Sequence, residues 1–426
     1  SISGTYVGIM PDLKAPYSYL LNASVSRQLK DNFTLEVGYT GRMSHKLLVQ
    51  QDVYSPLIYF KDPKSGSTWV QTDTAMRQLS DGGVTPAAVK ANPSLVPTNA
   101  FVENMFPALA NNYIPGSASA NYFYGIYKNN AGSDLDLLHQ LDRVTSAKFP
   151  NCIVATGCYT FFAPQGSSNP SWSNAGFANY NAMLVTLRHS LSKGFAFDLN
   201  YTWSHSIDNG STAASGANRS GGVLQNAFVL NASRGSSDFD TRHLINANVT
   251  YALPFGKGKS LLNTSHKWLD EIVGGWQVSS LIRVQSGQPK TIQGSGVFPT
   301  NYWNSSIAIP KGASPASGLF TDNQGNPSLF QSNLVTSAYQ DSYPGQAGFR
   351  GIVRTPWQRN VDLSVQKEFP LPWERHSLQF RAEAFNAFNF VNFTTVNLSL
   401  ADPGTFGEFS AAQDPRVLQL ALRYSF

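Results

Sequence analysis

The sequence is poor in charged residues and has no long apolar run. Only 13% of its 426 residues are charged, whereas 12% are aromatic, a balance that is unusual for a cytoplasmic enzyme. No stretch approaches the roughly 20 apolar residues that a membrane-spanning helix needs, and the mean hydropathy of −0.22 is mildly polar. Disorder does not fit either, because 42% hydrophobic residues can bury enough surface to offset the entropy of ordering the chain.

The sequence also lacks a strong excess of one charge sign. Its 31 Lys and Arg against 26 Asp and Glu leave a net charge of +5, which is small for this length and argues against a nucleic-acid partner. No glycine-rich phosphate loop, zinc-binding His-Glu-x-x-His or nucleophile elbow is present, so no cofactor is expected. The 34 Gly and 24 Pro favour a β-rich chain with large polar loops.

There are only two cysteines, Cys152 and Cys158, and no His or Cys accompanies them at metal-binding spacing. We interpret them as a local disulfide that shapes a loop in an oxidising compartment. Closing so short a loop contributes about 2–3 kcal/mol in the loop-entropy model. The alternative is a pair of unrelated free thiols in a reducing compartment. The chain begins without a basic segment followed by an apolar one, so any export signal is expected outside this sequence.

The informative pattern is an alternation of apolar and polar residues, which is typical of a strand with one apolar and one polar side. It is clearest after residue 194. One face of this run carries Phe195, Phe197, Leu199, Tyr201 and Trp203. The other face carries Ala196, Asp198, Asn200, Thr202 and Ser204.

A hairpin is predicted between this run and the one before it. Residues 183–191 alternate in the same way, and Ser192-Lys193-Gly194 between the two runs is a hairpin signal. Pairing about Lys193 places Arg188 opposite Asp198, Leu187 opposite Leu199, and Met183 opposite Trp203. Apolar residues then meet apolar ones and opposite charges meet, so the register is consistent.

The same pattern recurs and predicts about nine strands. They lie at residues 21–26, 33–40, 183–191, 195–203, 245–251, 276–284, 361–369, 378–382 and 418–426. Many are near the 9–11 residues that a tilted transmembrane β-strand requires.

The connection lengths distinguish a membrane barrel from a soluble sandwich. Short connections at residues 30–32, 192–194 and 370–376, with 254–274 as the exception, alternate with long ones at 41–180, 205–241, 286–357 and 388–415. Transmembrane barrels alternate in this way between tight periplasmic turns and extended extracellular loops, whereas a soluble sandwich does not sort its loops. We predict an all-β fold: an antiparallel transmembrane β-barrel segment with long extracellular loops, located in the bacterial outer membrane.

The polar face of the predicted strands carries charged residues. We expect them to face the barrel lumen and to form a network that holds the wall, rather than a substrate path. They are Arg188, Asp198, Arg283, Asp362, Arg381, Glu383 and Arg423. In a soluble sandwich the same residues would be a solvated outer face.

The chain ends on an alternating strand whose apolar face carries Leu420, Leu422, Tyr424 and Phe426. A terminal aromatic strand of this kind resembles the signal by which bacterial outer-membrane barrels are recognised by their assembly machinery. The assembly machinery and outer-membrane lipid are therefore expected partners.

Several short motifs follow one another in order along the chain. They are ANYNA at 178–182 leading into TLR at 186–188, NYTWSHSID at 200–208, SDFDTRH at 237–243, LPFG at 253–256, GGWQ at 274–277, SGQP at 286–289 and FRAEAFNAFN at 380–389. The series resembles the C-terminal barrel of Oar-like TonB-dependent outer-membrane transporters of the acidobacterial type. It begins near residue 17 and thins through residues 42–175.

This resemblance implies a receptor that binds a ligand at the cell surface and imports it with energy passed through TonB. A plugged transporter barrel has about 22 strands, more than twice the number predicted here, and no plug or N-terminal domain is recognisable. Residues 1–426 are therefore expected to be the C-terminal part of a larger receptor barrel. Residues 41–180 would form one long extracellular loop region, and the TonB complex would be contacted through the missing plug.

Ligand contacts are predicted in the longest loop, where amphipathic rings could stack on a sugar or peptide. The aromatic cluster there consists of Tyr113, Tyr122, Phe123, Tyr124 and Tyr127. The alternative is that these rings pack the loop against itself.

Metal binding and catalysis have little support in the sequence. Asp238 and Asp240 lie two residues apart, but this spacing is common in turns, so no metal site is predicted. His205, Ser206 and Asp208 contain the residue types of a catalytic triad. Neighbouring residues on a strand point to opposite faces, however, so His205 and Ser206 are not expected to pair and no enzyme is predicted. Two other functions stay open, namely a passive porin and a soluble or surface β-sandwich adhesin.

Overall fold

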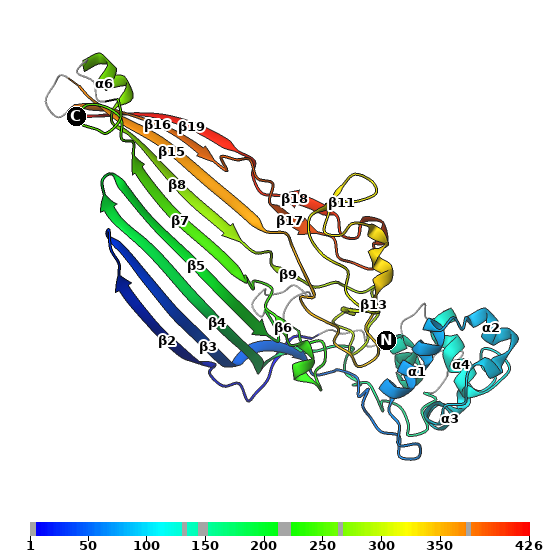
Figure 1. Cartoon of the computed structure of the whole chain (residues 1–426). Helices are drawn as coiled ribbons and strands as arrows, with labels where there is room; N and C mark the ends of the chain where they lie inside the picture. The colour runs from blue at the N-terminus through cyan, green and yellow to red at the C-terminus, as the bar shows by residue number, and fades with distance from the viewer. Residues whose placement is uncertain (1–5, 130–133, 144–151, 212–222, 263–266, 372–375) are drawn as a thin grey trace.

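Nine long strands form one antiparallel sheet in a computed structural model that describes residues 6–129, 134–143, 152–211, 223–262, 267–371 and 376–426. They are β2 (Tyr17–Gln28), β3 (Phe33–Asp52), β4 (Pro170–Ser192), β5 (Phe195–Asp208), β7 (His243–Ala252), β8 (Trp276–Gln285), β15 (Gln358–Pro370), β16 (Ser377–Phe385) and β19 (Val417–Ser425). Each pairs with its neighbour in sequence, so that β2 and β19 lie at the two opposite edges of the sheet (Figure 1). The nine predicted strands and their antiparallel order are confirmed, and they form an open sheet.

The register of the predicted hairpin is also confirmed. In the β4–β5 pair, Arg188 lies opposite Asp198, Leu187 opposite Leu199, and Met183 opposite Trp203. The registers of the other strand pairs align residues of the same face across the sheet. On the apolar face, for example, Leu199 is followed by Ala247, Ile282 and Val361 on the next three strands.

Two of the short connections are tight turns with a left-handed backbone. Asp31 and Asn32 have φ angles of 56° and 62°, and Lys193 and Gly194 have φ angles of 50° and 79°. Two successive left-handed residues give the primed turns whose twist matches that of paired strands. The connection between β7 and β8 is longer and holds α6 (Lys267–Val273). These turns and α6 lie at the end of the sheet that is opposite to the other helices (Figure 1); this end is called the short-turn rim below.

The first long connection is shorter than predicted, because β3 continues to Asp52 and β4 begins at Pro170. Register shifts between Ser44 and Leu47 and between Leu47 and Val49 break the alternation, so the sequence pattern ends before the pairing does. The connection therefore runs over residues 53–169 rather than 41–180.

The described residues between 58 and 162 fold into a helical subdomain that the alternation pattern did not predict. Its helices are α1 (Trp69–Asp81), α2 (Pro86–Ala91), α3 (Ala100–Met105), α4 (Ala118–Tyr124) and α5 (Asp134–Arg143), with short turns η1 (Pro93–Leu95), η2 (Pro107–Leu109) and η3 (Gly125–Asn129). Side-chain hydrogen bonds cap the N-termini of three of these helices. Thr68 and Gln71 make a reciprocal capping box on α1, and Asn99 and Ser117 cap α3 and α4. A core containing Trp69, Phe101, Phe106 and Phe161 holds the helices together.

Short two-stranded sheets order the last two long connections. They pair β9 (Pro289–Lys290) with β14 (Val353–Arg354), β10 (Ala308–Pro310) with β13 (Tyr339–Asp341), β11 (Phe320–Thr321) with β12 (Pro327–Ser328), and β17 (Phe393–Val396) with β18 (Phe409–Ala412). A second core forms there, with Ile292, Phe330 and Phe406 fully buried. Three 3-10 turns, η4 (Leu230–Ser233), η5 (Asn333–Ala338) and η6 (Pro403–Thr405), complete the loops.

Two short strands extend the main sheet at the end that carries the long connections. β1 (Gly8–Ile9) pairs with β4 in parallel, and β6 (Gly235–Ser236) pairs with β5. None of the helices in the described residues is both long enough and apolar enough to span a membrane.

Candidate functional site: the long-loop rim

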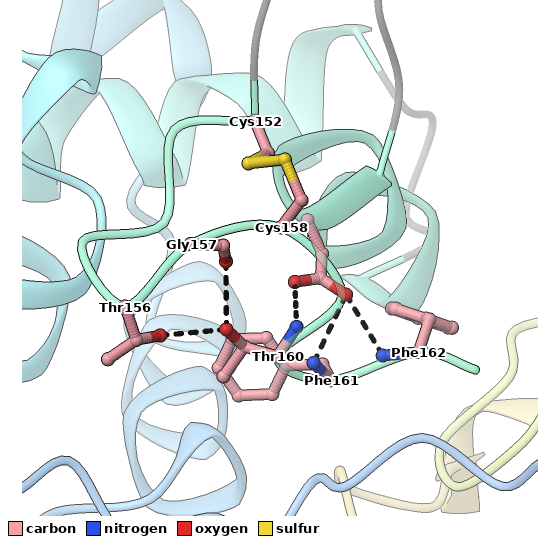
Figure 2. Close-up of a disulfide and its surroundings, with 8 residues drawn as sticks. Cys152, Thr156, Gly157, Cys158, Thr160, Phe161 and Phe162 are labelled. Carbon is pink, nitrogen blue, oxygen red and sulfur yellow. Dashed lines mark hydrogen bonds between the residues drawn. A yellow bond between two sulfur atoms is a disulfide. The ribbon is translucent and has the colours of Figure 1, made fainter. Parts of the chain in front are cut away.

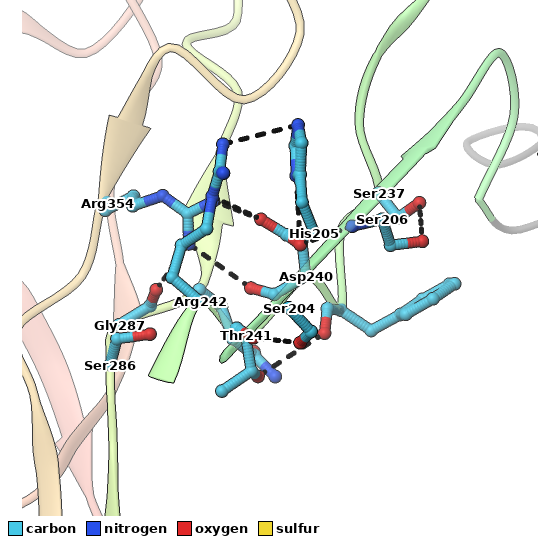
Figure 3. A network of polar contacts seen from close by, with 12 residues as sticks. Ser204, His205, Ser206, Ser237, Asp240, Thr241, Arg242, Ser286, Gly287 and Arg354 are labelled. Carbon is cyan, nitrogen blue, oxygen red and sulfur yellow. Dashed lines mark hydrogen bonds and ion pairs between the residues drawn. The ribbon is translucent and has the colours of Figure 1, made fainter. Parts of the chain in front are cut away.

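The long connections gather at one end of the sheet, which we call the long-loop rim (Figure 1). A buried carboxylate, Asp240, holds three segments of this rim together (Figure 3). It accepts a hydrogen bond of 2.6 Å from the backbone N–H of Ser206 at the end of β5. Arg242 lies 3.3 Å from its other oxygen, and Arg354 of β14 also pairs with it. Burial acts to raise the pKa of Asp240, but the bonds from Ser206, Arg354 and His205 outweigh burial and hold this pKa below its usual value.

A second ion pair ties the same segments together. Arg350 lies 2.9 Å from Asp208 and 3.4 Å from Asp238. The guanidinium also donates to the carbonyl of Ser233 at 3.0 Å and to the hydroxyl of Ser211 at 2.8 Å. The two acidic residues considered above for a metal site therefore have arginine partners. Among the described residues, no group of three or more His, Cys, Asp or Glu could hold a metal ion.

The three residues of the triad type do not form a nucleophilic site. The Oγ of Ser206 hydrogen bonds with that of Ser237 at 2.7 Å, whereas the ring of His205 contacts Asp240 through Nδ1 at 3.2 Å and Arg242 through its other nitrogen at 3.3 Å. Arginine can only donate, so this other nitrogen accepts and Nδ1 carries the proton. His205 acts here as a connector between two charged groups.

A polar cavity of about 590 Å³ opens beside these ion pairs. Its lining includes Asn209, Gln225, Asp238, Lys290, Trp303 and Arg350. It combines amides, both charge signs and one indole, which are groups that can orient a polar ligand. No pattern in the sequence indicated this cavity, because its lining comes from two separate connections, the one between β5 and β7 and the one between β8 and β15.

The helical subdomain lies against the later loops through polar contacts. The Tyr343 hydroxyl donates to Asp81 at 2.9 Å, and the Tyr302 hydroxyl donates to the carbonyl of Leu135, also at 2.9 Å. Asn226 donates to the Tyr59 hydroxyl at 2.8 Å. These bonds place the subdomain directly beside the loops that line the cavity.

The predicted ligand-contacting aromatic cluster divides into two groups. Tyr122 and Phe123 are 0% exposed inside the subdomain core, so they cannot touch a ligand, and this part of the prediction is wrong. These two rings pack inward because α4 needs an apolar side against α1 and α3. Tyr113, Tyr124 and Tyr127 are half-buried at the edge of the same core, and ligand contact by these three stays a prediction.

Two carboxyl groups lie side by side in the subdomain. Asp73 accepts a hydrogen bond from Tyr122 at 3.0 Å and is also hydrogen bonded to Asp134. Burial, together with the negative charge of Asp134, raises the pKa of Asp73 well above its usual value. Burial raises the pKa of Asp134 as well, although the guanidinium of Arg77, 3.5 Å away, acts against it. Asp73 is therefore the protonated member of the pair, and its O–H group donates a hydrogen bond to the carboxylate of Asp134.

Cys152 and Cys158 are joined by a disulfide in the structure (Figure 2). The chain leaving Cys158 folds over the end of α5. The buried carboxylate of Asp142 accepts hydrogen bonds from the N–H groups of Thr160, Phe161 and Phe162 at 2.8, 3.1 and 2.9 Å. The disulfide and this carboxylate together fix the segment that closes the subdomain.

The seven predicted lumen charges share one face of the sheet, as the registers of their strands require. They make local pairs in the described structure rather than one network. Arg188 lies 2.8 Å from Asp198, and Arg381 lies 2.5 Å from Glu383. Asp362 accepts from the backbone N–H of Asn386 at 2.8 Å.

The last strand, β19, presents its apolar residues outward at the edge of the sheet. Leu420 and Leu422 are 74% and 67% exposed, and Phe426 is 89% exposed. Such exposure of apolar side chains is expected where lipid or another strand covers them. Their role as an assembly signal stays a prediction.

A comparison with protein families identifies the fold. The model of the outer membrane beta barrel domain family matches residues 1–419. The chain belongs to this family. An outer membrane beta barrel domain lies in the outer membrane, so the predicted localisation is confirmed, and the exposed apolar face of the sheet is its lipid-facing side. No curated protein matches the sequence.

Solved structures of longer outer-membrane proteins resemble this outer membrane beta barrel domain. The outer membrane transporter YddB from Escherichia coli matches 100% of this chain and 35% of its own, with 10% identity and a TM-score of 0.41. The copper transporter OprC matches 98% of this chain and 32% of its own, with 7% identity and a TM-score of 0.33. The pyoverdine receptor FpvA from Pseudomonas aeruginosa PAO1 matches 96% and 30%, with 10% identity and a TM-score of 0.32. The chain thus spans about a third of their lengths.

Proposed function

We propose that the chain is the C-terminal part of a TonB-dependent receptor that binds a ligand at the cell surface and imports it. The observation that carries this proposal is the construction of the long-loop rim, with a helical subdomain, a second core and two ion-pair clusters around a polar cavity. A porin leaves an aqueous channel open through its barrel, and passive diffusion does not require a helical subdomain or a ligand-sized cavity at the rim. The motif series that resembles Oar-like transporters supports the same choice.

The open sheet agrees with this proposal. Its edge strands, β2 and β19, are not paired with each other, and about 22 strands enclose the lumen of a plugged transporter. We infer that further strands complete the barrel around the polar face. The plug and the segment that contacts TonB would belong to the rest of the protein. Ligand would first meet the cavity and the half-buried rings of Tyr113, Tyr124 and Tyr127.

Liposome swelling tests the receptor against the porin. The full-length protein, reconstituted into liposomes, is placed in isotonic arabinose, and swelling is followed by light scattering. A receptor with a plugged lumen gives no swelling, whereas swelling at the rate of a general porin contradicts the proposal.

Membrane fractionation tests the adhesin. The full-length protein should partition with the outer membrane, shift its gel mobility on heating, and be cleaved by external protease within residues 53–169. Recovery without detergent as a soluble species would return the β-sandwich adhesin to first place.

A further inference from the structure

A groove of about 930 Å³ lies at the short-turn rim, far from the long loops. Its lining includes Asp31, His189, Lys193, Phe195, Val249 and Tyr251. Register places the four strand residues of this set on the apolar face, because His189 and Val249 both pair with Phe197, and Phe195 pairs with Tyr251. The groove is therefore on the lipid-facing side of the sheet.

A β-bulge produces this hollow. On β4, His189 pairs with Phe197 and Ser192 pairs with Phe195, so β4 carries one extra residue between the two pairs. The bulge turns Leu191 outward, where it is 72% exposed, and leaves the small side chain of Ser192 opposite Phe195. The N–H of Ser190 donates to the carbonyl of Asn32 at 3.2 Å, which joins the bulge to the neighbouring turn. Bulges commonly re-aim side chains at the rim of a barrel.

His189 is a polar residue in an apolar place. It is only 9% exposed and is surrounded by the rings of Phe33, Phe195 and Phe197, with centroids at 4.6, 5.4 and 6.2 Å. Its Nδ1 lies 3.2 Å from the carbonyl of Phe195. A carbonyl only accepts, so Nδ1 donates to it, and Nε2 is the ring nitrogen that is left to accept. Nε2 makes no hydrogen bond with another described residue, so it is available to accept one from a ligand in the groove.

The groove also carries one charge of each sign. Asp31 and Lys193 lie at the tips of the two tight turns, and both line it. Within the part of the chain that the structure describes, neither residue belongs to an ion pair. A groove with apolar walls, an acid, a base and a hydrogen-bond acceptor matches a zwitterionic lipid that carries a phosphate, a protonated amine and acyl chains.

We propose that this groove binds one phospholipid with a phosphatidylethanolamine headgroup. The ammonium of Lys193 binds the lipid phosphate. The primary ammonium of the lipid donates to the carboxylate of Asp31 and to Nε2 of His189. The acyl chains lie along Phe195, Val249 and Tyr251. This inference does not depend on the ligand or on the energy source of transport, only on the lipid-facing side of the sheet.

Native mass spectrometry of the delipidated full-length protein tests the proposal. The protein is titrated with phosphatidylethanolamine, phosphatidylcholine and phosphatidylglycerol that have the same acyl chains. We expect phosphatidylethanolamine to bind about tenfold more tightly than phosphatidylcholine, whose methylated amine cannot donate, since one charge-assisted hydrogen bond is worth about a factor of ten. Equal binding of the three lipids, or a preference for phosphatidylglycerol, overturns the proposal.

Three variants locate the site. His189→Phe keeps the ring packing but removes one of the two acceptors, so it should reduce the preference for phosphatidylethanolamine over phosphatidylcholine, while Asp31 keeps part of it. Lys193→Asn keeps a residue that accepts a left-handed backbone and should weaken binding of all three lipids about tenfold. Lys30→Asn removes an exposed cation from the other turn, outside the groove, and is the matched control. Heat-modifiable gel mobility confirms that each variant is folded, and if His189→Phe does not fold, Lys193→Asn alone decides. Wild-type binding in both groove variants contradicts the site.

Discussion

Arg350 reaches back 142 residues along the chain to donate a hydrogen bond of 2.9 Å to the carboxylate of Asp208. The carboxylate belongs to the last residue of β5, and the arginine belongs to a loop that packs over the strand end. Together with Asp240 and Arg354, this pair makes the rim a single connected structure rather than a set of separate loops. The side chains of Arg350 and Asp208 are 11% and 4% exposed, so their interaction is little screened by water.

Arg350→Ala tests how much this connection stabilises the rim. Removing one partner of a buried pair leaves the other charge uncompensated, and the cost is about 3 kcal/mol. Hydrogen exchange of the full-length protein should become about a hundredfold faster in the peptides that contain Asp208 and Ser233.

The matched control is Arg381→Ala, because Arg381 is 48% exposed in its pair with Glu383. It should cost about 1 kcal/mol or less. Equal effects of the two substitutions would contradict the structural role of Arg350.

Asp73→Asn tests the shared proton in the helical subdomain. Folded Asp73 keeps its proton because burial and Asp134 raise its pKa above the ordinary 3.8. The unfolded chain loses this proton above about pH 4, so the folded state binds more protons. The stability contributed by this group is complete below the unfolded pKa and is lost as pH rises through the folded pKa.

Asparagine stays neutral and can still donate to Asp134. As pH rises from 4 to 8, the free energy of unfolding of the variant should therefore fall less than that of wild type. The variant should also unfold at a higher urea concentration than wild type at pH 8. The readout is the urea midpoint of the fluorescence change that Trp69→Phe removes. Asp136→Asn, on the same helix as Asp134, is the control and should behave as wild type. Identical pH dependence of wild type and Asp73→Asn would refute the shared proton.

Most of the sheet could be predicted from the sequence, because apolar and polar residues alternate along a strand that has one apolar and one polar face. Leu199 and Asp198, for example, differ in polarity as their two faces do. The end of β3 and the start of β4 could not be predicted, since the register shifts near Leu47 interrupt the alternation there.

The helical subdomain and the rim network were beyond sequence reasoning for a different reason. Helices as short as α4 are marginal alone and depend on tertiary packing, so the sequence pattern does not show that Tyr122 and Phe123 point into a core instead of contacting a ligand. The SDFDTRH motif was visible, but the partners of Asp240 lie 34 residues before it, at Ser206, and 114 residues after it, at Arg354. Only the fold brings these groups together.

The double substitution Cys152→Ser and Cys158→Ser tests the disulfide. Opening so short a loop costs about 2 kcal/mol in the loop-entropy model. The urea midpoint of the Trp69 signal should fall, while the heat-modifiable gel mobility of the barrel stays unchanged. Reduction of the wild-type protein should reproduce the effect. Labelling of two free thiols in the native oxidised protein would contradict the bond.

Leu199→Arg, compared with Asn200→Arg, tests which face of the sheet meets lipid. The two residues are neighbours near the middle of the membrane-spanning part of β5 and project to opposite faces. An arginine on the lipid face near the bilayer midplane costs about 2–4 kcal/mol, whereas lumen positions tolerate charge. When the full-length protein is refolded into phosphatidylcholine vesicles across a urea gradient, the folded fraction is read from heat-modifiable mobility. Leu199→Arg should fold only at lower urea, and Asn200→Arg should follow wild type.

Leu199→Val, which stays apolar, controls for the loss of the leucine itself. The reverse order of the two arginine variants would place lipid on the face that carries Asp198 and Arg188, and with it the whole assignment of lumen and membrane would be inverted.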